Sequence, residues 1–271
     1  MSAVLGRVPA RRGRLHRPPR ALRAYYVLLL ALLYLPIGIL FVFSLNDSNT
    51  VAFPLSGFTT AWFEQVLANG ALLRAVGNSV IVAIAASLAA TALGAMIALL
   101  LVRFEFRTKP LIAGLAVMPL IVPYVVLAVA LLILFRAADI PLSLVTIGVA
   151  HVVVALPFTT LIVLARLIGF ERTLEDAAMD LGASYPQTLR LVVLPIAAPA
   201  IIAAWLVAFT VSFDEVALAL FLAGREQTFP VFLLGQLRFA QTLPVLIAAA
   251  VLLMLASLAI ILVAERIRRL R

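Results

Sequence analysis

Residues 171–195 read ERTLEDAAMDLGASYPQTLRLVVLP and form a polar interlude between two strongly apolar segments. Thr173 can cap a short helix here, with Asp176 three residues later in the position of a capping-box acid. Helical spacing at i, i+3, i+4 and i+7 places four small or apolar side chains on one face, namely Leu174, Ala177, Ala178 and Leu181. The acids Glu175, Asp176 and Asp180 lie off that face.

A second short helix follows the first. Gly182 stands where a helix commonly ends in a left-handed residue. Ser184 and Gln187 have the spacing of a capping box, with Pro186 in the first turn, and Pro195 closes the unit. A compact surface helix with an Ala-Ala face indicates docking against another protein.

The composition indicates a membrane protein. Of 271 residues, 65% are hydrophobic and 12% are charged, whereas a soluble domain carries about a quarter charged residues. The absence of cysteine excludes disulfides and thiolate metal sites. The net charge of +9 lies at the ends of apolar runs and in the first 23 residues. This pattern favours topology signals and contact with anionic lipid over nucleic-acid binding.

Six apolar runs divide the chain, each close to or above the ~20 residues that cross a bilayer: 25–43, 75–102, 111–135, 142–164, 193–222 and 243–263. Pro119 and Pro123 interrupt the third run, which requires their freed backbone groups to be buried in protein or wetted. A small-xxx-small ridge in the second run permits close helix packing, through Ala86, Ala90, Gly94 and Ala98.

The connections between the runs are polar. Within the connection 44–73, residues 59–67 predict a short amphipathic helix whose apolar side chains suit a membrane interface; these are Trp62, Phe63, Val66 and Leu67. Residues 223–241 are polar and mixed. With the N-terminus inside, 17 of the 21 Lys and Arg residues fall on the cytoplasmic side. The positive-inside rule therefore predicts that both termini and the loop 171–192 are cytoplasmic.

The loop 171–195 and several segments of the apolar runs resemble a known family of membrane proteins. Asp-Ala-Ala at 176–178, Gly182, and then Val-x-Leu-Pro at 192–195 are similar to the EAA loop of bacterial ABC importer permeases, which usually has Glu at the first position and often Ile at 192. The segments 55–59, 78–79, 118–123 and 212–215 look like the spermidine/putrescine branch of these permeases, second subunit type.

The resemblance implies an all-α polytopic membrane protein of the inner (cytoplasmic) membrane, with six transmembrane helices in the type I ABC importer permease (MetI-like) fold. It divides the chain into a basic cytoplasmic tail (1–23), a permease domain (24–266, with core 72–264 and coupling loop 171–192) and a second basic tail (267–271). The implied partners are a cytoplasmic ABC ATPase dimer, a homologous permease subunit, a periplasmic substrate-binding protein and membrane lipid.

In such permeases the EAA loop inserts into the ATPase as a coupling helix. The residues implied to make this contact are Thr173, Leu174, Glu175, Asp176, Ala177, Ala178, Asp180, Leu181 and Gly182. The chain has no G-x-x-x-x-G-K-[ST] loop, so we expect no enzymatic activity and no cofactor in it. ATP and Mg²⁺ are expected in the partner ATPase.

Candidate pathway residues come from the runs themselves. Asp214 and Glu215 lie in the fifth run, and carboxylates inside a membrane are costly enough to indicate function. The alternative is a structural carboxylate with its own partner. Tyr124 could offer its ring to a cationic cargo or pack against helices. Asn78 could serve the pathway or join two helices. His151 is expected to be a hydrogen-bonded core residue.

Other readings stay open from the sequence. The same class of importer includes branches for thiamine, ferric iron, opines and phosphonate compounds. A proton-coupled secondary transporter using Asp214, Glu215 or His151 is a rival outside the class, although no internal duplication of spans is visible. A purely structural membrane anchor leaves the EAA-like loop unexplained.

Overall fold

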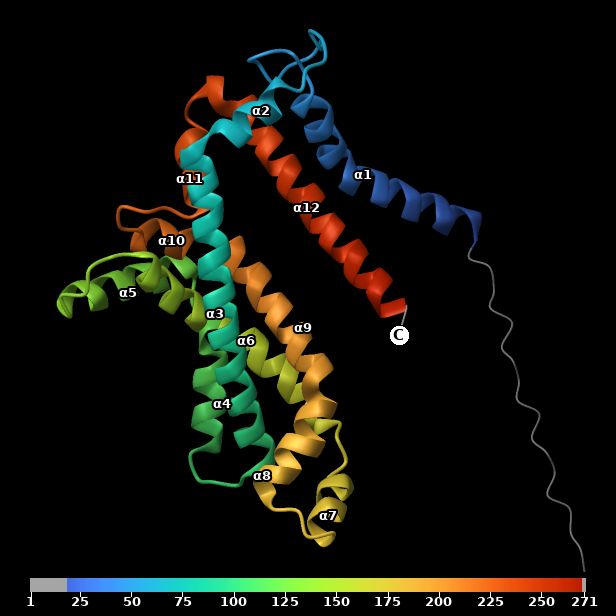
Figure 1. Cartoon of the computed structure of the whole chain (residues 1–271), viewed down its shortest axis with the longest axis vertical. Helices are drawn as coiled ribbons and strands as arrows, with labels where there is room; N and C mark the ends of the chain where they lie inside the picture. The colour runs from blue at the N-terminus through green and yellow to red at the C-terminus, as the bar shows by residue number, and fades with distance from the viewer. Residues whose placement is uncertain (1–18, 270–271) are drawn as a thin grey trace, which may run out of the picture.

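The computed structural model describes residues 19–269, which form helices and one isolated β-bridge between Asn46 and Phe58 (Figure 1). Five helical segments in this part of the chain are long and apolar enough to cross a membrane: Arg20–Ser44, Gly70–Arg103, Leu144–Ile168, Tyr185–Phe213 and Ala240–Ala259. The long helices in them are α1 (Arg20–Ser44), α3 (Gly70–Arg103), α6 (Leu144–Ile168), α9 (Leu194–Phe213) and α12 (Leu243–Arg269).

A bent pair of helices makes the sixth candidate span. α4 (Lys109–Val117) and the 3-10 turn η1 (Met118–Leu120) meet α5 (Tyr124–Ala137) at 108°. Pro119 lies in η1, and Pro123 directly precedes α5 with an extended ψ of 131°, where no α-helix can continue. The predicted interruption of the third run is therefore confirmed, and the turn is much sharper than a proline kink.

Short helices lie at the two ends of the long axis (Figure 1). We call the end with α7 (Thr173–Asp180) and α8 (Tyr185–Thr188) the α7 end, and the opposite end with α2 (Ala61–Ala68) the α2 end. The remaining elements are α10 (Ala217–Leu222), α11 (Phe229–Gln236), the π-helical turn η2 (Leu189–Val193) and the 3-10 turn η3 (Ala240–Thr242).

The centre of the molecule is the packing of α3, α6 and α9 against one another. The small-residue ridge predicted on α3 is confirmed, because Ala86, Ala90, Gly94 and Ala98 are all buried. The Thr159 hydroxyl on α6 donates a hydrogen bond to the Ala90 carbonyl at 2.8 Å. A Cβ at Gly94 would collide with the side chain of Thr159 and the backbone of Thr160. Close approach of α3 and α6 thus depends on glycine at this position.

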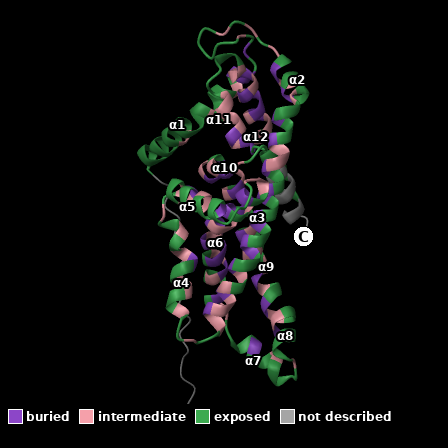
Figure 2. Cartoon of the chain, turned by 90° about the vertical axis from the view of Figure 1, so that its left-hand side faces the viewer, coloured by how far each residue is buried: buried purple, intermediate pink, exposed green. Residues whose placement is uncertain are grey.

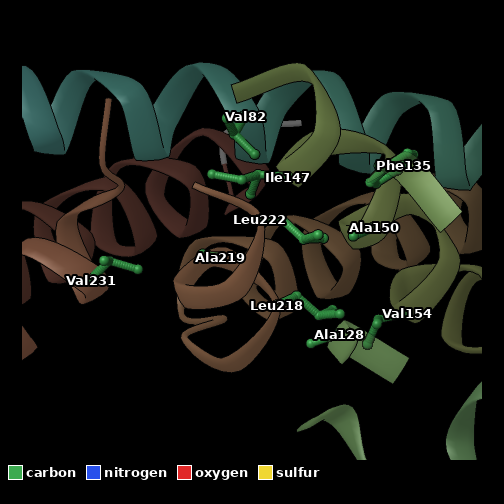
Figure 3. Close-up of a cluster of buried hydrophobic side chains, with 10 residues drawn as sticks. All are labelled: Val82, Ala128, Phe135, Ile147, Ala150, Val154, Leu218, Ala219, Leu222 and Val231. Atoms are coloured by element: carbon green, nitrogen blue, oxygen red, sulfur yellow. The ribbon is translucent and has the colours of Figure 1, made fainter. Parts of the chain in front are cut away.

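The main buried cluster joins α3, α5, α6, α10 and α11 (Figure 3). Its largest fully buried members are Ile147, Leu218 and Leu222. Because α10 is only six residues long, its place in the fold depends on this packing and on its termini rather than on its own helix stability.

The short helix predicted at 59–67 exists as α2, and two of its four apolar residues face protein while Leu67 is 67% exposed. Trp62 and Val66 are buried in a cluster with Leu72 of α3 and Ala248 of α12. The Trp62 indole donates to the Asn46 carbonyl at 2.8 Å, which satisfies its only polar group. Neighbouring helices therefore supply the apolar environment of Trp62 and Val66, and Leu67 is left open for lipid or another chain.

Two other segments depart from the sequence-based expectations. The polar connection 223–241 contains α11, whose Phe229 and Val231 are buried; Pro230 stands at its start, where proline is favourable. The helices also extend into the predicted tails, since α1 begins at Arg20 and α12 continues to Arg269. Residues 1–18 and 270–271 of those tails lie outside the described residues.

Helix α1 stands apart from the rest of the molecule and packs on α12 (Figure 1). Most of its side chains are exposed, in contrast to the buried stripes along α3 and α6 (Figure 2). An apolar helix exposed to this extent is suited to contact lipid or a second subunit.

Replacing Gly94 with alanine should destabilise the protein. The added methyl group overpacks the α3–α6 contact, which typically costs about 1–3 kcal/mol. Gly77→Ala is the matched control, because it lies on the same helix with no atom within 4 Å of its Cβ position, and alanine favours the helix by up to ~1 kcal/mol. Thermal unfolding in detergent should show a lowered midpoint for Gly94→Ala alone. Equal midpoints for the two variants would contradict the packing described.

Candidate functional site

The polar unit at the α7 end has the predicted two-helix form with one correction. Gly182 adopts a left-handed φ of 90° after α7, and Ser184 and Gln187 form the expected capping box of α8. Thr173 does not cap α7: the cap position is Arg172, in helical conformation and without a side-chain cap. The Thr173 hydroxyl is 3.4 Å from a carboxylate oxygen of Glu171 instead. The chain enters α7 through a helical turn, which leaves no extended residue for a capping hydroxyl.

One side of α7 faces outward and is both apolar and acidic. Leu181 is 90% exposed and Leu174 is 51% exposed. Ala177 is exposed and Ala178 half-buried beside them, and the carboxyl groups of Asp176 and Asp180 are also exposed. We call the residues Thr173, Leu174, Asp176, Ala177, Ala178, Asp180, Leu181 and Gly182 the α7 surface. Apolar side chains left this open in a short helix are a feature of docking surfaces.

Glu175 faces the opposite way. Its carboxylate forms an ion pair with the guanidinium group of Arg103, the last residue of α3, and the two side chains are only 8% and 6% exposed. Arg103 also lies over the ring of Phe170, 5.5 Å from its centroid. Of the nine residues predicted at the partner contact, Glu175 is thus the one that the structure turns toward its own chain.

Two further contacts hold the unit to the long helices. The Arg172 guanidinium donates to the Val102 carbonyl on α3 at 2.7 Å, and the ring of Phe104 meets that of Tyr185 edge-on at 6.2 Å. The other side of the unit runs directly into α9, because α8, η2 and α9 follow without a break. The α7 surface is therefore attached to α3 by side chains and to α9 by the backbone.

A second polar site lies where the fifth span ends. The fifth run, 193–222, is long enough to be tilted or broken, and the structure breaks it: α9 ends at Phe213 and α10 begins at Ala217. The Glu215 carboxylate accepts hydrogen bonds from the backbone N–H groups of Ala217, Leu218 and Ala219 at 3.0, 2.8 and 3.2 Å. A carboxylate that satisfies the free donors of a helix start stabilises that start, so Glu215 separates the two helices.

His151 completes this site from α6. Its Nδ1 lies 2.8 Å from the Ser212 hydroxyl, and its Nε2 lies 3.6 Å from a carboxylate oxygen of Glu215. Both ring and carboxylate are almost fully buried. The prediction that His151 is a hydrogen-bonded core residue is confirmed, and the contact fixes the end of α9 and the start of α10 against α6.

Asp214 has a different environment from its neighbour Glu215. It is exposed and lines a cavity of about 500 Å³ between α9, α11 and α12, together with Phe209, Phe213 and Met254. The rest of the wall is largely apolar. Asp214 therefore presents a carboxylate to an open cavity, while Glu215 is occupied by backbone donors.

The other two predicted pathway residues lie elsewhere. Tyr124, at the start of α5, is half-buried and packs on the main cluster. Asn78 donates to the Gln227 carbonyl at 3.0 Å, and Ser79 next to it accepts from the Phe229 N–H at 2.8 Å. These two contacts fix α3 to the segment before α11. Asn78 lines a separate cavity from Asp214, so the four residues do not converge on one site.

The sequence signals for these arrangements were partial. Two acids followed by the apolar run ALALFL at 217–222 are a helix-start pattern, which would have located the break. In the sequence Arg103 is only one of three basic residues that follow the second apolar run. No local signal pairs it with Glu175, because the contact joins residues 72 positions apart in the sequence.

Comparison with known proteins gives a consistent result. Residues 90–271 match the family model "Binding-protein-dependent transport system inner membrane component". The chain is 34% identical over 247 residues to the spermidine/putrescine transport system permease protein PotC of Haemophilus influenzae, covering 91% of this chain and 95% of that protein. It is 35% identical over 240 residues to PotC of Escherichia coli, covering 88% and 90%.

A further relative is the putrescine transport system permease protein PotI of Escherichia coli, 36% identical over 203 residues and covering 72% of each chain. Among solved structures, the fold is similar to a chain in the crystal structure of a bacterial ABC transporter involved in the import of the acidic polysaccharide alginate. The TM-score is 0.71 at 16% identity, with 92% of this chain and 98% of that chain covered.

Replacing Glu175 with glutamine should destabilise the α7 end. The change leaves the Arg103 charge buried without its counter-ion, which typically costs about 3–5 kcal/mol. The midpoint of thermal unfolding in detergent should fall by on the order of 10 °C, whereas the exposed neighbour Asp176→Asn should change it little. The double variant Arg103→Gln/Glu175→Gln should recover part of the loss, as expected for coupled residues. Additive losses would show that the ion pair does not hold α7.

Proposed function

The chain belongs to the family of binding-protein-dependent transport system inner membrane components, and from this premise we propose that it imports a polyamine as a permease subunit of an ABC transporter. The relatives named for spermidine and putrescine transport cover most of this chain at about the same level of identity. Since these relatives are transport permeases, ATP hydrolysis in this proposal belongs to a separate ATPase dimer that binds ATP and Mg²⁺, and this chain carries no cofactor.

The observation that carries the proposal is the α7 surface. It combines exposed leucines, small alanines and a left-handed glycine on a helix held firmly from behind. In the proposed complex this surface enters a cleft of the ATPase. Full burial of one leucine side chain contributes about 1.5–3 kcal/mol, and the small alanines allow close approach of the partner backbone.

The proposed orientation places the α7 end in the cytoplasm. The connections at the α7 end, 103–109 and 166–190, carry Arg103, Arg107, Lys109, Arg166, Arg172 and Arg190, while the connections on the other side of the spans carry Arg74, Arg136, Arg225 and Arg238. Together with the basic termini, this distribution follows the positive-inside rule. The binding protein would then deliver its cargo at the α2 end, and both termini would be cytoplasmic.

Coupling in this proposal is mechanical. ATP binding closes the ATPase dimer and moves α7 with its cleft. Because α7 is paired to α3 through Arg103 and joined to α9 through η2, the two central helices would move with it and open the path toward the binding protein. In this proposal the packed helices have two discrete arrangements, one open toward the binding protein and one open toward the cytoplasm, as an alternating-access cycle requires. A second, homologous permease would form the other wall of the path, against surfaces such as that of α1.

The cargo would meet Asp214 rather than Glu215. A polyamine carries several ammonium groups, and an exposed carboxylate on an open cavity can pair with one of them. Glu215 already accepts three backbone hydrogen bonds, so its proposed role is to hold the α9–α10 break in place. Tyr124 and Asn78, at the start of α5 and on α3, remain proposed contributors to the wall of the path.

Gly182→Asp should abolish transport without affecting membrane insertion. The substitution adds strain at a φ of 90° and a charge on the α7 surface. Gly169→Asp is the matched control, because this residue lies just before α7 with an ordinary φ of −80°. We would measure ATP-dependent uptake of radiolabelled spermidine by the complete transporter in liposomes. Normal uptake by Gly182→Asp would contradict the coupling role, and no polyamine uptake by the wild-type complex would contradict the proposed cargo.

Asp214→Asn should lower polyamine uptake by about tenfold, the equivalent of ~1.4 kcal/mol, because the pathway loses its charge for the ammonium groups. Basal ATPase activity and assembly of the complex should be unchanged. Asp139→Asn serves as the control: Asp139 is also exposed and outside that cavity, and its φ of 54° is one that asparagine tolerates. Equal uptake kinetics for wild type and Asp214→Asn would remove this residue from the path.

A further inference from the structure

A second feature of the α7 end is a pocket of about 700 Å³ between α3, α4, α6 and the segment leading into α7. Three basic residues line it, Arg103, Lys109 and Arg172. The rest of the lining is mainly apolar and includes Leu164 and Ile168 of α6 and Ala113 of α4. A cavity with positive charge at one part and an apolar wall at another matches an amphiphile with an anionic head.

One of the three cations has unused hydrogen-bonding capacity. The Arg103 side chain is 6% exposed, and its Nε has no hydrogen-bond partner among the described residues. Buried guanidinium N–H groups are normally satisfied. Glu175 compensates the charge of Arg103 but does not engage this donor. Because this nitrogen is itself buried, Arg103 contributes charge to the pocket wall rather than a donor that a ligand could reach.

The other two cations are engaged on one side only. Arg172 uses one terminal nitrogen for the Val102 carbonyl. Lys109 pairs with the exposed Glu105 at 2.7 Å, and this contact lowers the pKa of the Glu105 carboxyl. Glu175 and Glu105 neutralise two of the three positive charges, so the pocket and its surroundings keep a net positive charge.

The pocket also lies at a defined level of the molecule. The apolar run of α3 stops at Arg103, α4 begins at Lys109, and α6 ends at Ile168, all beside the pocket. Helix ends at which apolar runs give way to basic residues mark the boundary between hydrocarbon and headgroups. The apolar wall then lies on the membrane side and the cations on the aqueous side.

We propose that this pocket binds the phosphate headgroup of an anionic phospholipid, with part of an acyl chain along the wall formed by α4 and α6. A free phosphate ion would use the cations but not the apolar wall. Since Arg103 and Arg172 also hold α7, the bound lipid stabilises the attachment of the coupling unit. Anionic lipid is then a requirement of efficient coupling, in addition to the proposed transport function.

Native mass spectrometry of the complete transporter, purified from its host membrane, tests the binding. The wild type should retain phosphatidylglycerol or cardiolipin, and Lys109→Gln should retain about tenfold less, equivalent to ~1.4 kcal/mol. Arg107→Gln is the matched control, since Arg107 lies two residues before Lys109 and does not line the pocket; it should retain lipid as the wild type does. The proposal would be overturned if Lys109→Gln retained as much anionic lipid as the wild type. It would also be overturned if the wild type, after lipid exchange, retained phosphatidylcholine as well as it retains anionic lipid.

Two further arms separate other occupants. Glycerol 3-phosphate should not displace the lipid; displacement would assign the site to a free phosphate ester and overturn the proposal. If the permease pair retained lipid only after the ATPase had been removed, the ATPase would occupy the pocket in the complete transporter. That result would also overturn the proposal.

A functional measurement tests the effect on coupling. ATPase activity in liposomes should rise with the phosphatidylglycerol fraction for wild type and Arg107→Gln and should not rise for Lys109→Gln. The mass measurement does not depend on the cargo, so it distinguishes failure of this inference from failure of the proposed function.

Discussion

The hydrocarbon core of a bilayer contains no water to hydrogen-bond backbone groups that are freed where a helix is interrupted. This constraint governs where the chain can depart from a helix. The third span breaks at two prolines, which have no N–H to satisfy. The fifth ends at Phe213, where Glu215 supplies the acceptors for the next helix start. The helices that follow the two breaks, α5 and α10, pack on each other in the main buried cluster. Protein encloses the fifth-span break, where Glu215 is buried, whereas the third-span break is open, with Ile121 81% exposed. The open break therefore has to be covered by a second subunit or wetted by a cavity.

The two ends of the molecule have different mechanical properties. At the α7 end, side-chain contacts through Arg103 and continuous backbone through η2 tie a surface unit to both central helices. Away from that end, α1 contacts mainly α12 and stays exposed. A force applied at the α7 surface would thus act on α3 and α9 as a unit. The close α3–α6 contact at Gly94 extends that unit to a third helix.

Much of this architecture follows from the sequence, for identifiable reasons. Hydropathy locates the spans because only long apolar helices satisfy both lipid and backbone, and Gly182 is predictable because few residues adopt a positive φ cheaply. The buried side of α2 was not predictable, because Trp62 satisfies the pattern of an interfacial residue and of a core residue equally well. The direction of Glu175 depends on Arg103, and long-range pairs leave no periodic signal in a single sequence.

Two pairs of adjacent acids illustrate how one helix end can serve structure and function together. Neighbouring residues on a helix point about 100° apart, which separates Glu175 from Asp176 on α7, while the break between α9 and α10 separates Asp214 from Glu215. Glu175 is buried against Arg103 while Asp176 is exposed; Glu215 is buried against backbone donors while Asp214 faces a cavity. In each pair the inward carboxylate fixes the backbone that positions the outward one. A buried carboxylate that is already paired is not available to a ligand, but it holds the local backbone in place. The exposed carboxylate beside it therefore sits on an ordered backbone when it contacts a partner or a cation.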